Sequence, residues 1–140
     1  MAQTYASEVS GLGTTPTTNS NGAVQGGRVR RFRATITLAS QGDGDTVVLA
    51  QVSAGYAFAY GILNASATLA TSTIAVGVSG TPAKYRAAAV FTAAAPTLFG
   101  VSTAMDDAPL GSGETVILTN TTAALPSSGT LIVDLYFSAP

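Results

Sequence analysis

Apolar residues alternate with small or polar ones along much of this chain, and the period of two sets its fold class. The alternation is clearest in residues 71–92, where one face of a strand would carry Ile74, Val76 and Val78. Successive side chains of a strand point to opposite sides, so this pattern predicts a strand with one buried face. The sequence Ser79-Gly80-Thr81-Pro82 then predicts a break, because proline cannot donate to a ladder and glycine readily takes a positive φ.

The same pattern predicts strands on both sides of this stretch. Residues 28–39 would turn Phe32, Ala34, Ile36 and Leu38 inward, and residues 130–138 would turn Leu131, Val133, Leu135 and Phe137 inward. Residues 46–52 are apolar on both faces, which predicts a central strand, and residues 56–63 would group Phe58, Tyr60 and Ile62 on one face. Residues 83–92 fit either a helical turn or a short strand, because an alanine run precedes Val90 and Phe91.

With further short strands at 97–101 and 114–119, we predict an all-β fold, an antiparallel β-sandwich that is jelly-roll-like. The sandwich body would span residues 28–140. Residues 1–27 are rich in Thr, Ser, Gly, Asn and Gln, and we predict an extended N-terminal arm there rather than a loose tail. Tyr5, Val9 and Leu12 are spaced apolar anchors that a plain linker would not need.

Only 9% of the residues are charged, against about 25% in an ordinary soluble domain, and the net charge is −1. We interpret this as a surface largely covered by partners, the alternative being a small soluble monomer. The absence of His and Cys removes the commonest general base and thiolate chemistry. No signal peptide or membrane-spanning segment is visible, so we expect synthesis in a cytoplasm without export.

Four of the six basic residues, Arg28, Arg30, Arg31 and Arg33, lie at the junction of arm and body. They could contact an acidic protein surface, bind phosphate, or prevent another strand from pairing with an edge strand. Nucleic acid is disfavoured, because the rest of the chain is net negative and has no interleaved aromatic residues.

No group of residues in the sequence predicts a catalytic or metal-binding site. Asp43 with Asp45, and Asp106 with Asp107, could bind a hard cation such as calcium, but turn formation explains them better. The sequons at Asn64 and Asn120 are incidental without export. We therefore predict no enzyme activity, no catalytic residue, no metal site and no cofactor.

The segments T-I-A-V-G and A-K-Y-R-A-A-A with a following F-T, together with the pair at residues 35–50, resemble the capsid decoration (cement) proteins of tailed bacteriophages. The likeness covers about residues 30–137. It implies a β-sandwich on the outside of an icosahedral shell, usually a homotrimer, that braces adjacent capsomers.

On this resemblance we expect a structural virion protein, made in the bacterial host cytoplasm and located on the capsid surface, that stabilises contacts between major capsid protein subunits. Its partners would be the major capsid protein and itself, as a homotrimer, without nucleic acid or membrane. The expected interface comprises Tyr5, Val9, Leu12, Arg28, Arg30, Arg31, Arg33, Lys84, Tyr85 and Arg86. The alternative is a host-glycan-binding module of a phage tail or fibre, and a bacterial adhesin-like domain is disfavoured by the missing signal peptide.

Deletion of residues 1–27 tests the arm. We expect the truncated body to fold but to bind shells poorly, because the spaced anchors are lost. Amide exchange of the free full-length protein should leave residues 1–27 unprotected, because their composition cannot bury enough apolar surface. Equal shell occupancy by truncated and complete chains, measured by co-sedimentation, would show that residues 1–27 are a loose tail without a role in binding.

Overall fold

A computed structural model describes residues 16–17, 26–92, 94–105 and 108–140 of the chain. These residues form eight strands and no helix, so no described helix could cross a membrane. The strands are β1 (Arg28–Thr37), β2 (Thr46–Val52), β3 (Ala57–Ala65), β4 (Thr73–Val78), β5 (Thr81–Val90), β6 (Thr97–Phe99), β7 (Glu114–Thr121) and β8 (Thr130–Ala139).

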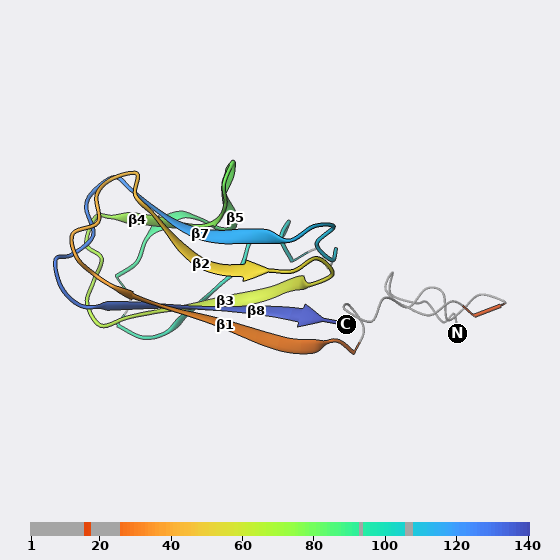
Figure 1. Cartoon of the computed structure of the whole chain (residues 1–140). Helices are drawn as coiled ribbons and strands as arrows, with labels where there is room; N and C mark the ends of the chain where they lie inside the picture. Colours follow the sequence, from red (N-terminus) through yellow and green to blue (C-terminus); the bar gives the residue numbers. More distant parts are fainter. Residues whose placement is uncertain (1–15, 18–25, 93, 106–107) are drawn as a thin grey trace, which may run out of the picture.

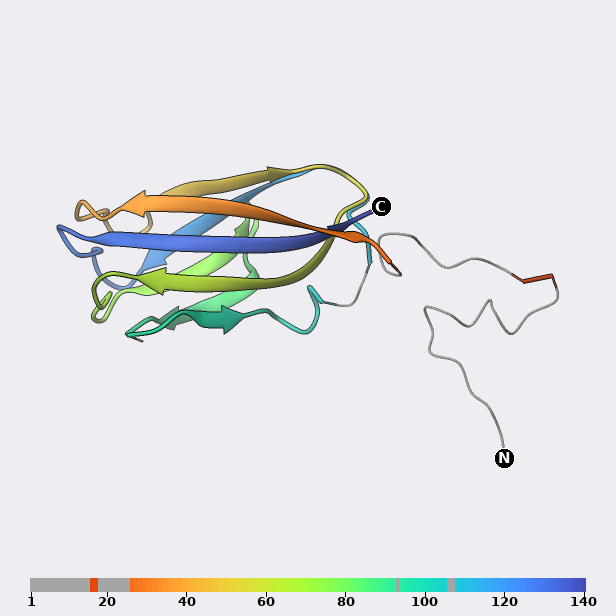
Figure 2. The same cartoon turned by 90° about the horizontal axis from the view of Figure 1, so that it is seen from below.

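The strands form two packed antiparallel sheets, one above the other in Figure 1. Sheet A has the order β1-β8-β3-β6 and is seen from its outer side in Figure 2; sheet B has the order β2-β7-β4-β5. The first strand pairs with the last, the second with the seventh, the third with the sixth and the fourth with the fifth. This is the strand order of a jelly roll, and it confirms the predicted antiparallel β-sandwich.

The core lies between the sheets, with the aromatic ring of Phe137 near its centre. The inward residues of β8 are fully buried as predicted, and Phe137 meets Phe32, Phe58 and Tyr85 edge-on, at centroid distances of 5.8, 5.4 and 5.8 Å. Aromatic side chains bury large apolar areas and favour such edge-to-face packing. The ring therefore joins β1, β3 and β8 of sheet A to β5 of sheet B.

The prediction that residues 46–52 form a central strand is wrong, because β2 is the edge strand of sheet B. A register shift between Val48 and Ala50 places an extra residue in β2. Leu49 is thereby buried, while the side chain of Val48 is 62% exposed. The strand has apolar residues on both faces because of this bulge, and not because both faces are covered.

The predicted grouping of Phe58, Tyr60 and Ile62 on one face of β3 is also wrong. The register shifts between Phe58 and Tyr60, so the strand changes the face it turns inward. Phe58 stays in the core, and Leu63 is buried after the bulge. Tyr60 and Ile62 are only half-buried and lie on the outer face of sheet A.

Residues 83–92, which were ambiguous from sequence, lie mostly in strand β5. The break after β4 is shorter than expected, a turn at Ser79 and Gly80 in which Gly80 has a φ of 86°. Pro82 falls inside β5, where it is tolerated because β5 is the other edge strand of sheet B.

The turn between β1 and β2 is held by side chains. The Asp45 carboxylate accepts a hydrogen bond from the Gly42 amide at 2.6 Å, and the Asp43 carboxylate accepts one from the Thr122 amide at 3.0 Å. These contacts give both carboxylates the turn role that the sequence favoured.

Asn120, at the end of β7, is buried and ties three segments together. Its Nδ2 donates to the carbonyl oxygens of Gln41, Gly42 and Ala123 at 3.1, 2.9 and 3.0 Å. Its Oδ1 accepts a hydrogen bond from the hydroxyl of Ser72. The sequon at Asn120 is therefore enclosed in the fold, which agrees with its interpretation as incidental.

Replacing Asn120 by alanine should lower the free energy of unfolding by about 2–4 kcal/mol, because a buried hydroxyl and several carbonyls lose their partners together. Asn64→Ala, at a half-buried asparagine of β3, is the matched control and should change it by less than about 0.5 kcal/mol. Urea denaturation followed by circular dichroism measures both. Equal effects of the two substitutions would contradict the role assigned to Asn120.

Candidate protein-interaction surface

The four arginines of β1 are divided between the two faces of the strand. Arg28 and Arg30 alternate in phase with Phe32 and the inward residues, whereas Arg31 and Arg33 lie in phase with the outer face of sheet A. All four are exposed: Arg28, Arg30 and Arg31 are among the first four residues of β1, which are exposed on both faces, and Arg33 is exposed on the outer face just after Phe32, where burial begins. The start of β1 therefore presents cations in two directions.

Arg33 is held in an ion pair with Asp134, which lies directly opposite on β8. Its Nε donates to Oδ1 at 2.8 Å and its Nη2 donates to Oδ2 at 2.7 Å, a bidentate geometry. Asp134 is only 6% exposed, while the Arg33 side chain is 49% exposed. The hydrogen bonds from Arg33 lower the pKa of the Asp134 carboxyl, with a smaller contribution from the charge of Arg31.

A row of larger side chains runs beside this ion pair on the outer face of sheet A. Arg31 is the register partner of Tyr136, and Tyr136 is the partner of Tyr60 on β3. The two tyrosine rings stack with centroids 4.6 Å apart and planes inclined by 17°. On the next row, Ile62 pairs with Leu98 of β6, which is 67% exposed.

We call this set the Arg–Tyr face: Arg31, Arg33, Tyr60, Ile62, Leu98, Asp134 and Tyr136. Tyrosine and arginine are the residue types that most often dominate protein–protein binding energy. Sequence reasoning found only the two arginines of this face. The others could not be found because their neighbourhood depends on the bulge in β3 and on the pairing of the first strand with the last.

Lys84 and Tyr85, which were predicted at the interface, are engaged within the fold. The Lys84 ammonium donates to the Glu114 carboxylate at 2.6 Å and lies 5.2 Å from the centroid of the Tyr85 ring. Tyr85 is 1% exposed, its ring is 4.4 Å from that of Phe58, and its hydroxyl donates to the other Glu114 oxygen. An interface role for Tyr85 does not fit this structure, because the ring belongs to the core.

Arg86 donates hydrogen bonds to main-chain carbonyls of its own strand, β5, and of the neighbouring β4. Its guanidinium donates to the carbonyl oxygens of Ile74, Ala89 and Val90, the last two at 3.2 and 3.3 Å. Two register shifts between β4 and β5 flank this region, and the arginine supplies donors to carbonyls there. Burial lowers the pKa of the Arg86 guanidinium. The structure thus brings none of Lys84, Tyr85 and Arg86 to the Arg–Tyr face, and Tyr5, Val9 and Leu12 lie outside the described residues.

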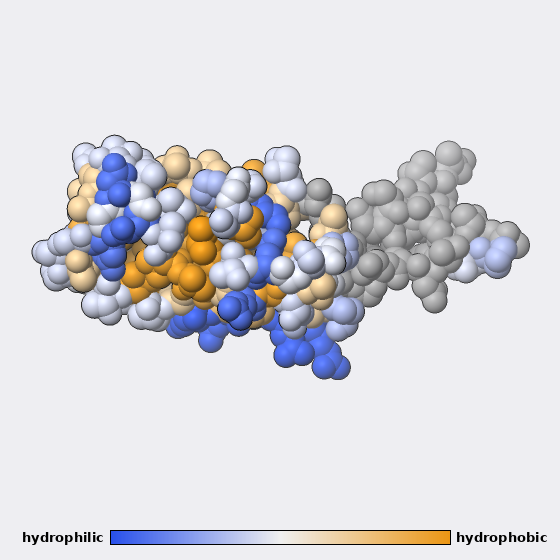
Figure 3. All heavy atoms as spheres, turned by 45° about the horizontal axis from the view of Figure 1, so that its top comes forward, coloured by the Kyte–Doolittle hydropathy of each residue, from blue (hydrophilic) through white to orange (hydrophobic). Residues whose placement is uncertain are grey.

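The outer side of sheet B differs in polarity from the Arg–Tyr face of sheet A. Figure 3 shows an apolar area over this sheet, with strongly hydrophilic atoms along the lower edge of the molecule. The residues on this outer side include the exposed Val48 of β2 and its half-buried register partner Ile117 of β7, and neither is charged.

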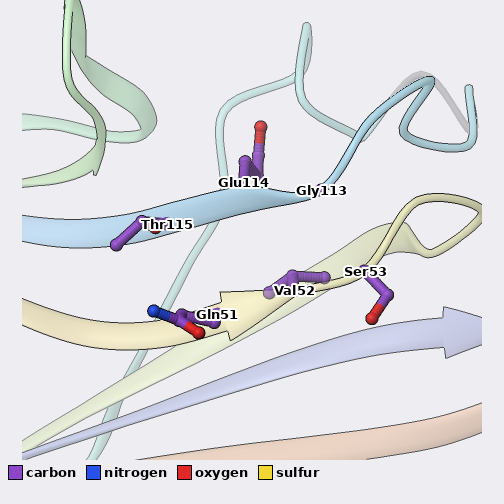
Figure 4. A pocket seen from close by; sticks show the side chains of 6 residues that line it. All are labelled: Gln51, Val52, Ser53, Gly113, Glu114 and Thr115. Carbon is purple, nitrogen blue, oxygen red and sulfur yellow. The ribbon is translucent and has the colours of Figure 1, made fainter.

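A hollow of about 480 Å³ lies where β2 ends and β7 begins. Its lining is shown in Figure 4, where the side chains of Glu114 and Ser53 point in opposite directions. The Glu114 carboxylate is already held by Lys84 and Tyr85. Polar groups therefore do not converge in this hollow, as they do in a ligand site.

Three solved structures share the fold at low sequence identity. A chain in the capsid of Ralstonia phage GP4 is 20% identical with a TM-score of 0.67, over 81% of this chain and 86% of that one. A chain in the cyanophage Pam1 capsid asymmetric unit is 15% identical with a TM-score of 0.64, over 81% and 86%.

The third is a chain in the acid-stable capsid of Helicobacter pylori bacteriophage KHP30. It is 15% identical with a TM-score of 0.58, over 80% of this chain and 89% of that one. No protein-family model and no curated protein sequence matches the chain. The expected likeness to phage capsid proteins is thus confirmed at the level of the fold.

The Arg33–Asp134 pair makes stability depend on pH in the acid range. Because the pKa of Asp134 is lowered by folding, the pair contributes stability above the ordinary carboxyl pKa of about 3.9 and loses it as the pH falls below that value. Asp134→Asn should therefore be less stable than the parent at pH 6 and should lose less stability between pH 6 and pH 3.

Urea denaturation at each pH measures this difference. Arg33→Gln and the double variant complete a thermodynamic cycle, in which the effects of the two single changes should not add. Parallel losses in the parent and in Asp134→Asn would contradict the assigned coupling.

Proposed function

We propose that this protein is a structural component of a bacteriophage virion, which binds the outer surface of the capsid and stabilises contacts between major capsid protein subunits. The observation that carries the proposal is the shared sandwich, which spans about four-fifths of this chain and nearly the whole of a chain in each of three phage capsids. Because those shares are so similar, the compared chains are of nearly equal length. A small sandwich of this kind suits a component that is added to the capsid and turns over no substrate.

The distribution of charge supports attachment through β1. Arg33, Lys84 and Arg86 are used inside the fold, which leaves Arg28, Arg30 and Arg31 without an ion pair to any described residue. These three exposed cations, of which Arg31 belongs to the Arg–Tyr face, suit contact with an acidic surface on a major capsid protein. In this proposal Tyr5, Val9 and Leu12 of the arm add apolar anchors on a neighbouring subunit.

The proposal includes a homotrimer on the capsid surface, with no nucleic acid and no membrane as partner. Repeated contacts across a lattice gain strength from high effective concentration, so each contact can be weak. Light scattering coupled to size-exclusion chromatography tests the trimer directly.

A second candidate is a glycan-binding module of a tail or fibre. One observation favours it: the stacked rings of Tyr60 and Tyr136 lie on an outer sheet face beside the polar Arg33–Asp134 pair. A glycan screen with the parent and with Tyr136→Ala distinguishes the candidates, since a capsid-binding protein should give no signal that depends on Tyr136.

Changing Arg28, Arg30 and Arg31 to glutamine should weaken attachment to shells about tenfold or more, and most at low salt, because exposed charges are screened over about 8–10 Å at ordinary ionic strength. Co-sedimentation with purified shells over a salt series measures this effect. Lys84→Gln, which removes one cation on sheet B, is the control and should leave attachment unchanged. Parent-like occupancy of the triple variant at all salt concentrations would contradict attachment through β1.

Shells that carry the protein should release DNA at a higher temperature than shells that lack it, because a ligand that binds only the assembled state stabilises that state. An interface of about 1,600 Å² per copy would have to be broken before a subunit leaves. Adding purified protein should restore the difference, and the effect should be constant between pH 5 and 8, since the chain has no histidine. Dye access to packaged DNA during heating provides the measurement, and identical curves with and without the protein would remove the bracing function.

A further inference from the structure

The four edge strands of the two sheets are not equally protected. β6 is only three residues long, β5 contains Pro82 and two register shifts, and β2 has a bulge between Val48 and Ala50. Short length, proline and bulges are the usual ways in which proteins prevent another strand from pairing with an edge. Each of these three edges therefore carries such a device.

β1 lacks these three devices and is protected by charge alone, since its arginines repel a second basic strand but not an acidic one. It is ten residues long, contains no proline, and pairs with β8 in an uninterrupted register from Arg28 to Thr37. In an antiparallel ladder about half of the main-chain groups of an edge strand point away from its partner. Among the described residues no strand pairs with this outward side of β1, so its main-chain donors and acceptors have no partner strand there.

The side chains at the start of β1 determine which segment could pair there. Arg28 and Arg30 project from one face and Arg31 from the other, whereas Arg33 is already neutralised by Asp134. Val29 lies among the arginines and is 61% exposed. A strand beside this edge would have cations flanking both of its faces and one apolar contact.

We propose that the free edge of β1, from Arg28 to Phe32, binds an extended acidic segment of a partner protein as an added strand. Main-chain hydrogen bonds would supply affinity, and carboxylates at alternating positions of the segment would pair with the arginines. This inference rests on the proposed function, and it names the kind of segment through which the shell would be engaged. A single-stranded nucleic acid suits the edge less well, since its phosphates cannot donate to the outward carbonyls of β1.

The test uses the complete protein and an eight-residue peptide in which glutamate alternates with threonine and valine. A second peptide has the same sequence but is N-methylated at alternate residues, so that it keeps its charge and cannot form a ladder along one edge. We expect the first peptide to bind with protection of main-chain amides in residues 28–33 from hydrogen exchange. The N-methylated peptide should bind about tenfold more weakly or worse, because several main-chain hydrogen bonds are lost together.

Two variants with equal changes in net charge provide the matched control. Arg28→Gln with Arg30→Gln should weaken binding of the first peptide about tenfold, and Gln51→Glu with Ala88→Glu, at exposed positions of sheet B, should not. Equal binding of the two peptides, or binding without amide protection in β1, would show attraction by charge alone and would overturn the added strand. Failure of the first peptide to bind would overturn it as well.

These outcomes are independent of shell binding, which is measured by co-sedimentation. A protein that binds shells but not the peptide would retain the proposed function and lose the added strand. A protein that binds the peptide with amide protection but not shells would retain the added strand and lose the proposed function. An oligonucleotide of equal charge that binds more tightly than the peptide would reassign the edge to nucleic acid.

Discussion

The ladder between β1 and β8 is the interaction on which the rest of the structure depends. It joins the first and the last strand without a register shift, and it attaches β1 to sheet A as an edge strand. The same register places Phe32 next to Phe137 in the core and Arg33 opposite Asp134 on the outer face. One ladder therefore places Phe32 in the aromatic core and sets the two arginines of the Arg–Tyr face beside Asp134 and Tyr136.

The local parts of the fold could be read from the sequence, and the parts that depend on distant partners could not. The alternation in β8 correctly predicted its buried residues, since a regular strand fixes the face of every side chain. The interpretation failed for Tyr60 because a bulge changes the face, and for residues 46–52 because apolar composition does not distinguish a bulged edge strand from a central one. The ion pair of Arg33 could not be predicted, because no local pattern says that the first strand lies beside the last.

The predicted site residues divide in the same way. The arginine cluster was visible as a concentration of charge in the sequence, and the structure divides it into Arg33, which is paired, and three exposed cations. Lys84, Tyr85 and Arg86 looked like a charged surface segment, but register shifts in β5 bring them to Glu114, to the core and to main-chain carbonyls. The carboxylates of Asp43, Asp45, Glu114 and Asp134 are likewise all engaged. A chain with few charges has thus used most of its described ones internally, and the remaining cations gather at the start of β1.

The position of β8 between β1 and β3 affects how sheet A can form while the chain is being synthesised. Without β8, which comprises the residues from Thr130 to Ala139, β1 has no partner strand and β3 pairs only with the short β6. Pairing between such distant parts of a chain is slow, because the entropy of closing a long loop is lost before the contacts between the strands can stabilise the chain. A nascent chain that still lacks this strand has neither Asp134 nor Tyr136, and so it has no Arg–Tyr face. Under the proposed attachment through β1, such a chain would also lack the strand that holds the exposed arginines of β1 in place, because β1 pairs only with β8 among the described strands.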